Sequence, residues 1–159
     1  MQFRDRVNKF LEWTLVVLMS VLVLDVLWQV ISRYVLTAPS SFTDELAGFL
    51  LIWVGLLGSA YVTGKNEHLA IDIMLQRSGE KRQRILRLFI YVTVALFALF
   101  VLVIGGSWLV YTRFYLKVNS AALRIPLGYV YLILPFSGLI VLYYTLDDLK
   151  KVFLNRSLS

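Results

Sequence analysis

Apolar residues in this chain gather in four long runs that carry almost no charge. The runs are residues 13–32, in which Asp25 is the only charged side chain, and 46–63, 88–112 and 125–146, which contain no Asp, Glu, Lys or Arg. Each has about the 17–25 residues that a helix needs to cross a bilayer, and none alternates in polarity as a barrel strand does. We predict an all-α membrane protein with transmembrane helices at about residues 11–33, 44–63, 86–112 and 125–146.

The composition agrees with a single four-helix transmembrane domain over residues 1–159. The chain is 59% hydrophobic and 16% charged, whereas soluble domains contain about 25% charged residues. Arg4, Arg6 and Lys9 precede the first run, as basic residues precede a signal sequence. This run is too long for the apolar core of a signal peptide, and three more spans follow it. We therefore predict that the first helix is retained.

The basic residues are distributed unevenly between the two sides of the predicted membrane domain. Three precede the first span, six lie between the second and third spans, and three follow the fourth, but only one and three lie in the other two loops. Because short cytoplasmic loops carry the excess of Lys and Arg, we predict that both termini are cytoplasmic. The chain has a net charge of +6, but its Lys and Arg residues flank membrane spans and form no separate basic domain. We therefore expect no nucleic-acid partner.

The connections predict two further features. Residues 65–87, between the second and third spans, mix apolar and charged side chains, and we predict an interfacial segment along the membrane surface there. Pro135 lies about half-way along the fourth span and is expected to kink it.

Candidate chemistry is sparse. The chain has no cysteine, and its one histidine is His68, so thiol catalysis, thiolate metal sites and bis-histidine haem are excluded. No nucleophile triad, phosphate loop or metal-ligand cluster can be assembled from the remaining residues. We expect no enzymatic activity and no cofactor, and we interpret His68 as an interfacial residue.

Asp25 is the only charge well inside a predicted span, and Gln29 lies one turn away on the same face. A carboxylate in the bilayer costs about 2.5–3.5 kcal/mol unless another group satisfies it. Asp25 could be a proton or ion site, or a structural residue hydrogen-bonded to Gln29 or to another subunit. We favour the structural interpretation, because no other span offers a relay partner.

Four further residues are candidates for a partner interface or for closing a helix hairpin. Arg33 ends the first span on the same side on which Asp44 and Glu45 begin the second, so an ion pair could close the hairpin, or these charges could face another protein. Trp53, near the middle of the second span, is followed by the small residues Gly55, Gly58 and Ser59. This pattern suits either internal packing or a docking ridge for another membrane subunit.

Five short segments follow one another in the chain: Trp28–Leu36, Thr43–Ala47, Leu51–Ala60, Glu67–Asp72 and Ser120–Pro126. Their order resembles the small permease subunit, of the DctQ type, of TRAP (tripartite ATP-independent periplasmic) transporters. The resemblance covers nearly the whole chain. It implies a bacterial inner-membrane importer in which this subunit supports a much larger permease subunit that holds the substrate and sodium sites. An extracytoplasmic binding protein would deliver a carboxylate-bearing organic acid, such as a C4-dicarboxylate or sialic acid.

Two other functions stay open at this stage. The chain could be a self-sufficient small transporter that forms oligomers and uses Asp25. It could also be a membrane enzyme subunit that binds quinone or haem, although a single histidine disfavours haem.

Overall fold

The computed structural model describes residues 2–36, 40–65 and 80–154, and these ranges are almost entirely helical. The elements are α1 (Gln2–Tyr34), α2 (Ser41–Lys65), α4 (Glu80–Phe97), the π-helix η1 (Ala98–Gly105), α5 (Gly106–Tyr115), α6 (Leu127–Tyr131) and α7 (Ile133–Leu154). Most of the predicted interfacial segment, including His68, lies outside the described residues.

Within the residues that the structure describes, four helical stretches are long and apolar enough to cross a membrane, which confirms the predicted fold class. They are Arg4–Tyr34, Ser41–Lys65, Arg82–Tyr115, in which α4, η1 and α5 run on as one helix, and Leu127–Val152, which joins α6 and α7. Each is longer than the apolar run that predicted it, because helices continue past the hydrocarbon into the interfacial regions.

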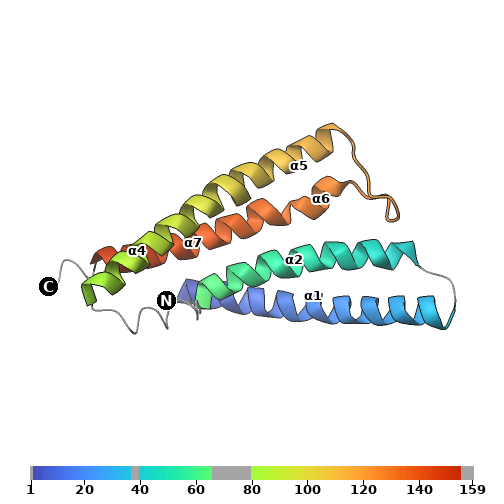
Figure 1. The fold of residues 1–159 in the computed structure, drawn as a ribbon, viewed down its shortest axis with the longest axis horizontal. Coiled ribbons are helices and arrows are strands. Elements are labelled where there is room, and N and C mark those ends of the chain that lie inside the picture. Colours follow the sequence, from blue (N-terminus) through green and yellow to red (C-terminus); the bar gives the residue numbers. More distant parts are fainter. Residues whose placement is uncertain (1, 37–39, 66–79, 155–159) are drawn as a thin grey trace.

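The four stretches form two hairpins, α1 with α2 and the long α4–α5 helix with α6 and α7 (Figure 1). The first residues of α1 and the last residues of α7 lie at one end of the molecule (Figure 1), which we call the terminal end. The opposite end, where α1 meets α2 and α5 meets α6, is the loop end. The hairpins lie close together at the terminal end and diverge toward the loop end, so the molecule is a wedge.

Helix α7 lies at the centre of the packing. One apolar cluster combines Leu11 of α1, Leu57 of α2, and Ile133 and Tyr144 of α7. A second cluster joins Ala60 of α2 and Val141 of α7 to the long helix. Because α7 contributes to both clusters, it is the element that connects the two hairpins.

The π-helical stretch η1 and the start of α5 pack against the first part of α7, just after the interruption between α6 and α7. A Cβ atom on Gly138 would lie 2.7 Å from the Cβ of Leu102, and one on Gly106 would lie 2.8 Å from the Cβ of Leu134. The interruption falls at Leu132, three residues before Pro135, whose ring has no N–H to donate and clashes with the preceding turn. The helix breaks where the sequence predicts a kink, and two glycines allow the backbones to approach closely there.

Polar side chains join three helices at the terminal end in what we call the Arg4 clasp. The Arg4 guanidinium donates to Asp148 at 2.6 and 3.1 Å and to Asp147 at 3.0 Å, and it also donates twice to the Gly64 carbonyl, at 2.9 and 3.1 Å. Its side chain is 14% exposed and that of Asp148 is 5% exposed. One arginine therefore binds α2 and α7 to α1.

The space beside the clasp admits no side chain at Gly64. A Cβ there would lie 2.6 Å from Oδ1 of Asn8 and 2.7 Å from the Tyr144 ring. Asn8 in turn accepts a hydrogen bond from the Tyr144 hydroxyl at 2.6 Å. Glycine is thus required for α1, α2 and α7 to meet at this point.

We predict that Asp148→Asn destabilises the chain far more than Asp147→Asn. Asp148→Asn removes the charge of the more buried partner, while Arg4 keeps its bonds to Asp147 and to the Gly64 carbonyl, so we expect a cost of about 1.5–3 kcal/mol, as for one hydrogen-bonded contact to a charged group. Asp147 is 36% exposed and also binds Lys151, so its loss should cost at most about 1 kcal/mol. Thermal unfolding in detergent, followed by fluorescence, should show a midpoint lower by several degrees for Asp148→Asn. Equal shifts for the two variants would contradict this role of the clasp.

Candidate functional site

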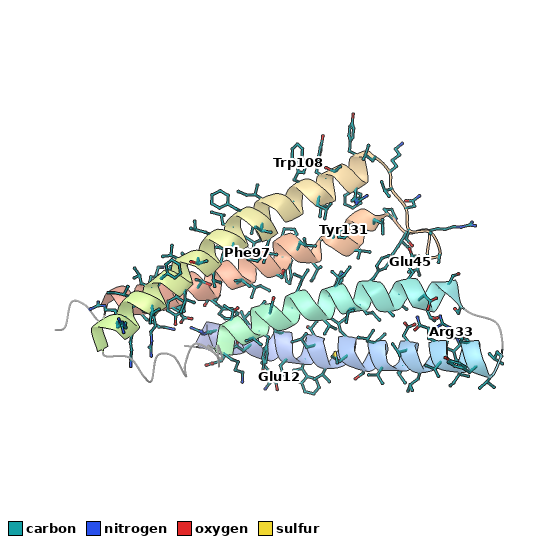
Figure 2. All side chains as sticks on the ribbon, viewed as in Figure 1. Glu12, Arg33, Glu45, Phe97, Trp108 and Tyr131 are labelled. Carbon is teal, nitrogen blue, oxygen red and sulfur yellow. The ribbon has the colours of Figure 1, made fainter. Side chains whose placement is uncertain are left out.

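At the loop end, Glu45 of α2 holds the connection between α5 and α6. Its carboxylate accepts hydrogen bonds from the Ser120 hydroxyl at 2.6 Å and from the backbone N–H groups of Ala121, Ala122 and Leu123 at 2.8–3.0 Å. We call this arrangement the Glu45 clasp. Figure 2 shows Glu45 on the side of α2 that faces this connection. Every group that reaches the carboxylate is a donor, which suits its ionised form.

The connection itself has a defined backbone. The Ser120 N–H donates to the Ile125 carbonyl at 2.9 Å, and the Leu127 N–H donates to the Val118 carbonyl at 3.0 Å. Lys117 and Arg124 adopt positive φ angles of 49° and 54°, which cost L-residues about 1–2 kcal/mol each. Successive N–H groups that point into a concave turn form an anion site, and Glu45 supplies the anion. The clasp thus stabilises a strained loop against the other hairpin.

Arg33 and Asp44 lie near each other, but their contact is loose. The nitrogen and oxygen atoms are 4.0 Å apart, and both side chains are at least half exposed. An exposed pair at this distance contributes about 0–1 kcal/mol. Figure 2 places Arg33 near the end of α1. The structure brings Arg33 toward Asp44 across the hairpin, while Glu45 turns to the second hairpin.

Asp25 is buried on α1, with 8% of its surface exposed. Its Oδ2 atom has no hydrogen-bond partner among the described residues. Gln29, one turn further along α1, is half-buried, and its carbonyl accepts a bond from the Ser32 hydroxyl at 2.9 Å. The structure gives no hydrogen bond between the side chains of Asp25 and Gln29 within the described part of the chain.

Trp53 faces the interior of the molecule. Its indole Nε1–H donates to the Val130 carbonyl at 3.0 Å, and its ring packs against the cluster around Leu57. Val130 lies two residues before the helix interruption at Leu132, where regular backbone pairing fails. The tryptophan supplies a donor to a carbonyl that the broken helix leaves available.

The small residues that follow Trp53 lie on the other side of α2. A Cβ on Gly48, Gly55 or Gly58 would meet nothing within 4 Å. Ser59 is exposed and bonds only its own helix, at the Leu56 carbonyl. Trp53 and the glycines are therefore separated, with the tryptophan packed inside the chain and the small residues on an open helix face.

No group of three or more His, Cys, Asp or Glu side chains gathers in the described ranges in a way that could hold a metal ion. The candidate residues described above make hydrogen bonds and contacts between helices.

Comparison with known proteins agrees with the sequence resemblance. The family described as the DctQ component of tripartite ATP-independent periplasmic transporters matches residues 22–155, which is most of the chain. The chain belongs to this family. It is a small permease subunit of a TRAP transporter, a multi-pass protein of the inner membrane, and not an enzyme.

Three relatives extend the comparison. A Haemophilus influenzae Rd protein named for a TRAP transporter small permease is 28% identical over 85% of this chain and 82% of its own length. The Vibrio cholerae sialic acid TRAP transporter small permease protein SiaQ is 26% identical over 98% of this chain and 90% of its own. The H. influenzae sialic acid TRAP transporter permease protein SiaT is 31% identical over 55% of this chain but only 14% of its own length.

Two parts of this small permease could not be identified from its sequence. Arg4 is one of several flanking basic residues there, and Asp148, 144 positions away, follows the last apolar run without any sign of pairing. Ser120 lies in a segment that carries the family resemblance, but its connection to Glu45 is made largely by backbone N–H groups. Such groups occur at almost every residue, so no side-chain pattern marks them.

We predict that Glu45→Gln loosens the loop between α5 and α6. The amide has one acceptor instead of two and places an NH₂ group against the loop's own donors. Hydrogen bonds to a charged acceptor are stronger than those to a neutral one, so exchange of the amide hydrogens of residues 121–123 should accelerate about tenfold. Hydrogen exchange with mass spectrometry measures this. Asp44→Asn makes the same charge change one residue away and should leave the loop unchanged, whereas acceleration in both variants would refute a specific clasp.

Proposed function

We propose that this chain is the supporting membrane subunit of a sodium-coupled importer for a carboxylate-bearing organic acid, of the C4-dicarboxylate or sialic acid class. Its partner is a larger permease subunit that holds the substrate and sodium sites, and an extracytoplasmic binding protein delivers the substrate. The observation that carries this proposal is the family match over residues 22–155. Two of the relatives are named for sialic acid transport.

The partnership with a larger permease has separate support. The match to SiaT covers just 14% of that protein, so a segment similar to this chain occurs within a much longer permease polypeptide. The presence of such a segment and a large permease region in one polypeptide supports the idea that the two act together. Among the described residues the α6–α7 span is interrupted at Leu132, but no second span carries a matching interruption of the kind that forms substrate sites in inverted-repeat transporters.

We place the large subunit against the open face of α2. Gly48, Gly55 and Gly58 leave its backbone uncovered, and small residues allow a helix of another subunit to approach closely in lipid. In this proposal the glycines of α2 contact the large subunit, and Trp53 packs inside the small subunit.

We place both termini in the cytoplasm and the loop end on the outer side, following the distribution of Lys and Arg. Arg33, Lys117 and Arg124 are exposed at that end, and the Glu45 clasp fixes the loop that carries two of them. This surface is the part of the chain available to the binding protein. The clasp would then present a fixed docking surface.

The first test is purification of the tagged chain from its native membranes in mild detergent, with mass spectrometry of the proteins that accompany it. We expect a much larger polytopic protein in stoichiometric amount. Gly55→Leu should abolish its recovery, because the added side chain occupies the open face without a clash inside this chain. Gly105→Leu is a matched control on the long helix, where a Cβ would meet only the Phe100 carbonyl, at 3.4 Å. Recovery of this chain alone, as a stable homo-oligomer, would contradict the proposal.

Asp25→Asn distinguishes the supporting role from a self-sufficient transporter. Asn keeps the size of the side chain and removes the possibility of ionisation, so a structural Asp25 tolerates it. We expect uptake of radiolabelled C4-dicarboxylate or sialic acid by cells with the complete transporter to remain within about twofold of the unaltered system, since Asn fills the same buried space and a structural role requires no charge. If uptake is abolished while the complex stays intact, Asp25 takes part in transport and the chain is more than a supporting subunit.

A further inference from the structure

One face of the long α4–α5 helix is covered by no other part of the described chain. The bulky apolar residues on this face recur at intervals of three or four, as neighbours along a helix do, and each is at least 41% exposed. They are Ile85, Phe89, Val92, Leu96, Phe100 and Ile104. Trp108, Tyr111 and Tyr115 continue the face through α5 and are 62–74% exposed. We call these residues together the ridge.

The chemistry of the ridge changes in order along its length. At the terminal end it is preceded by the exposed cation Arg82, three residues before Ile85. It then carries only hydrocarbon side chains until it reaches Trp108, Tyr111 and Tyr115, which end in an indole N–H or a phenol hydroxyl. The centroids of these three rings lie 6.4 and 6.0 Å apart in succession. Figure 2 shows Trp108 on the side of α5 that points away from the other helices.

This order and its spacing match the layers of a bilayer. The hydrocarbon part of the ridge, Ile85–Ile104, is about 28 Å long at an α-helical rise of about 1.5 Å per residue, and the hydrocarbon core of a bilayer is about 30 Å thick. Trp and Tyr gather at the boundary between hydrocarbon and headgroups, and a basic side chain at a helix end reaches the headgroup level. A partner protein would not require this succession of chemical types along one helix face.

The shape of the ridge also disfavours a partner helix. Small residues let transmembrane helices approach closely, but every ridge position carries a large side chain. The open face of α2 is the opposite case, since Gly48, Gly55 and Ser59 occupy exposed positions on it. The chain therefore has two uncovered faces of different kinds, one suited to a helix and the other to lipid.

We propose that the ridge is a lipid-facing surface of the assembled transporter. Acyl chains cover Ile85–Ile104, the headgroups of the outer leaflet surround Trp108–Tyr115, and Arg82 reaches the phosphates of the cytoplasmic leaflet. The orientation and the presence of a large subunit rest on the proposed function, whereas the contact with lipid rests on the ridge itself. The large subunit consequently binds another side of this chain.

Spin labels on single cysteines test this placement, because the chain has no cysteine of its own. Phe89→Cys, Leu96→Cys and Tyr111→Cys place a nitroxide on the ridge, and Ser59→Cys places one on the open face of α2. All four positions are exposed, so the label does not disturb packing inside the chain. Each labelled full-length chain is reconstituted in lipid vesicles, alone and as the complex purified with the large subunit. Power-saturation EPR then measures collisions with oxygen, which dissolves in the hydrocarbon, and with a water-soluble nickel chelate.

The ratio of oxygen to nickel accessibility should be highest at residue 96 and lower at residues 89 and 111, which lie nearer the two headgroup layers. The large subunit should leave oxygen accessibility at these three positions unchanged and reduce it severalfold at residue 59. A fall at the ridge positions when the large subunit is present would make the ridge its binding surface and overturn the proposal. Low oxygen accessibility in the isolated chain would also overturn it, because a second copy would then cover the ridge. Failure to recover a large subunit contradicts the proposed function, but the measurement on the isolated chain still tests the contact with lipid.

Discussion

The contact between Arg4 and Asp148 is the constraint on which the arrangement of these helices depends. Lipid tails are as apolar as leucine, so in a bilayer burial of apolar surface does little to bring helices together. Helix α1 illustrates the problem, since only 6% of its most apolar stretch is buried within the chain, against 39% for the α6–α7 helix. A bidentate, largely shielded ion pair gives α1 a fixed position against α7 that its apolar side chains could not provide.

The Glu45 clasp plays the corresponding role at the opposite end by a different means. It joins the hairpins through backbone N–H groups of a loop, where the Arg4 clasp joins them through side chains of opposite charge. Between the two clasps a groove of about 560 Å³, lined by residues that include Phe10, Trp53 and Leu139, opens between the hairpins. Two polar contacts at the ends of the molecule thus hold a wedge whose middle is available to lipid or to another subunit.

The spans could be predicted from the sequence because bilayer thickness demands long apolar runs, whatever the details of packing. The break near Pro135 could be predicted because a missing N–H acts locally. The sequence could not predict which face of each helix packs inward. Trp53 and the glycines after it, for example, occupy a span that is apolar on all sides. The π-helical stretch at Ala98–Gly105 also has no signal in the sequence, and its close contact with Gly138 of α7 joins positions 36 residues apart. The charged residues that the sequence suggested for one hairpin contact have different partners in the structure. Glu45 binds the loop of the second hairpin, whereas Arg33 lies beside Asp44.

The order of synthesis gives the Arg4 clasp a further meaning. Proteins are made from the N-terminus, and membrane helices leave the ribosome one after another. Arg4 is therefore present from the start of translation, but its principal partner is 144 residues away and is made only when the last helix is nearly complete. Until then α1 and α2 have no ionic attachment to the rest of the chain through this residue. Closure of the clasp thus marks completion of the subunit, because a chain interrupted before Asp147 would hold Arg4 to α2, at the Gly64 carbonyl, but not to α7.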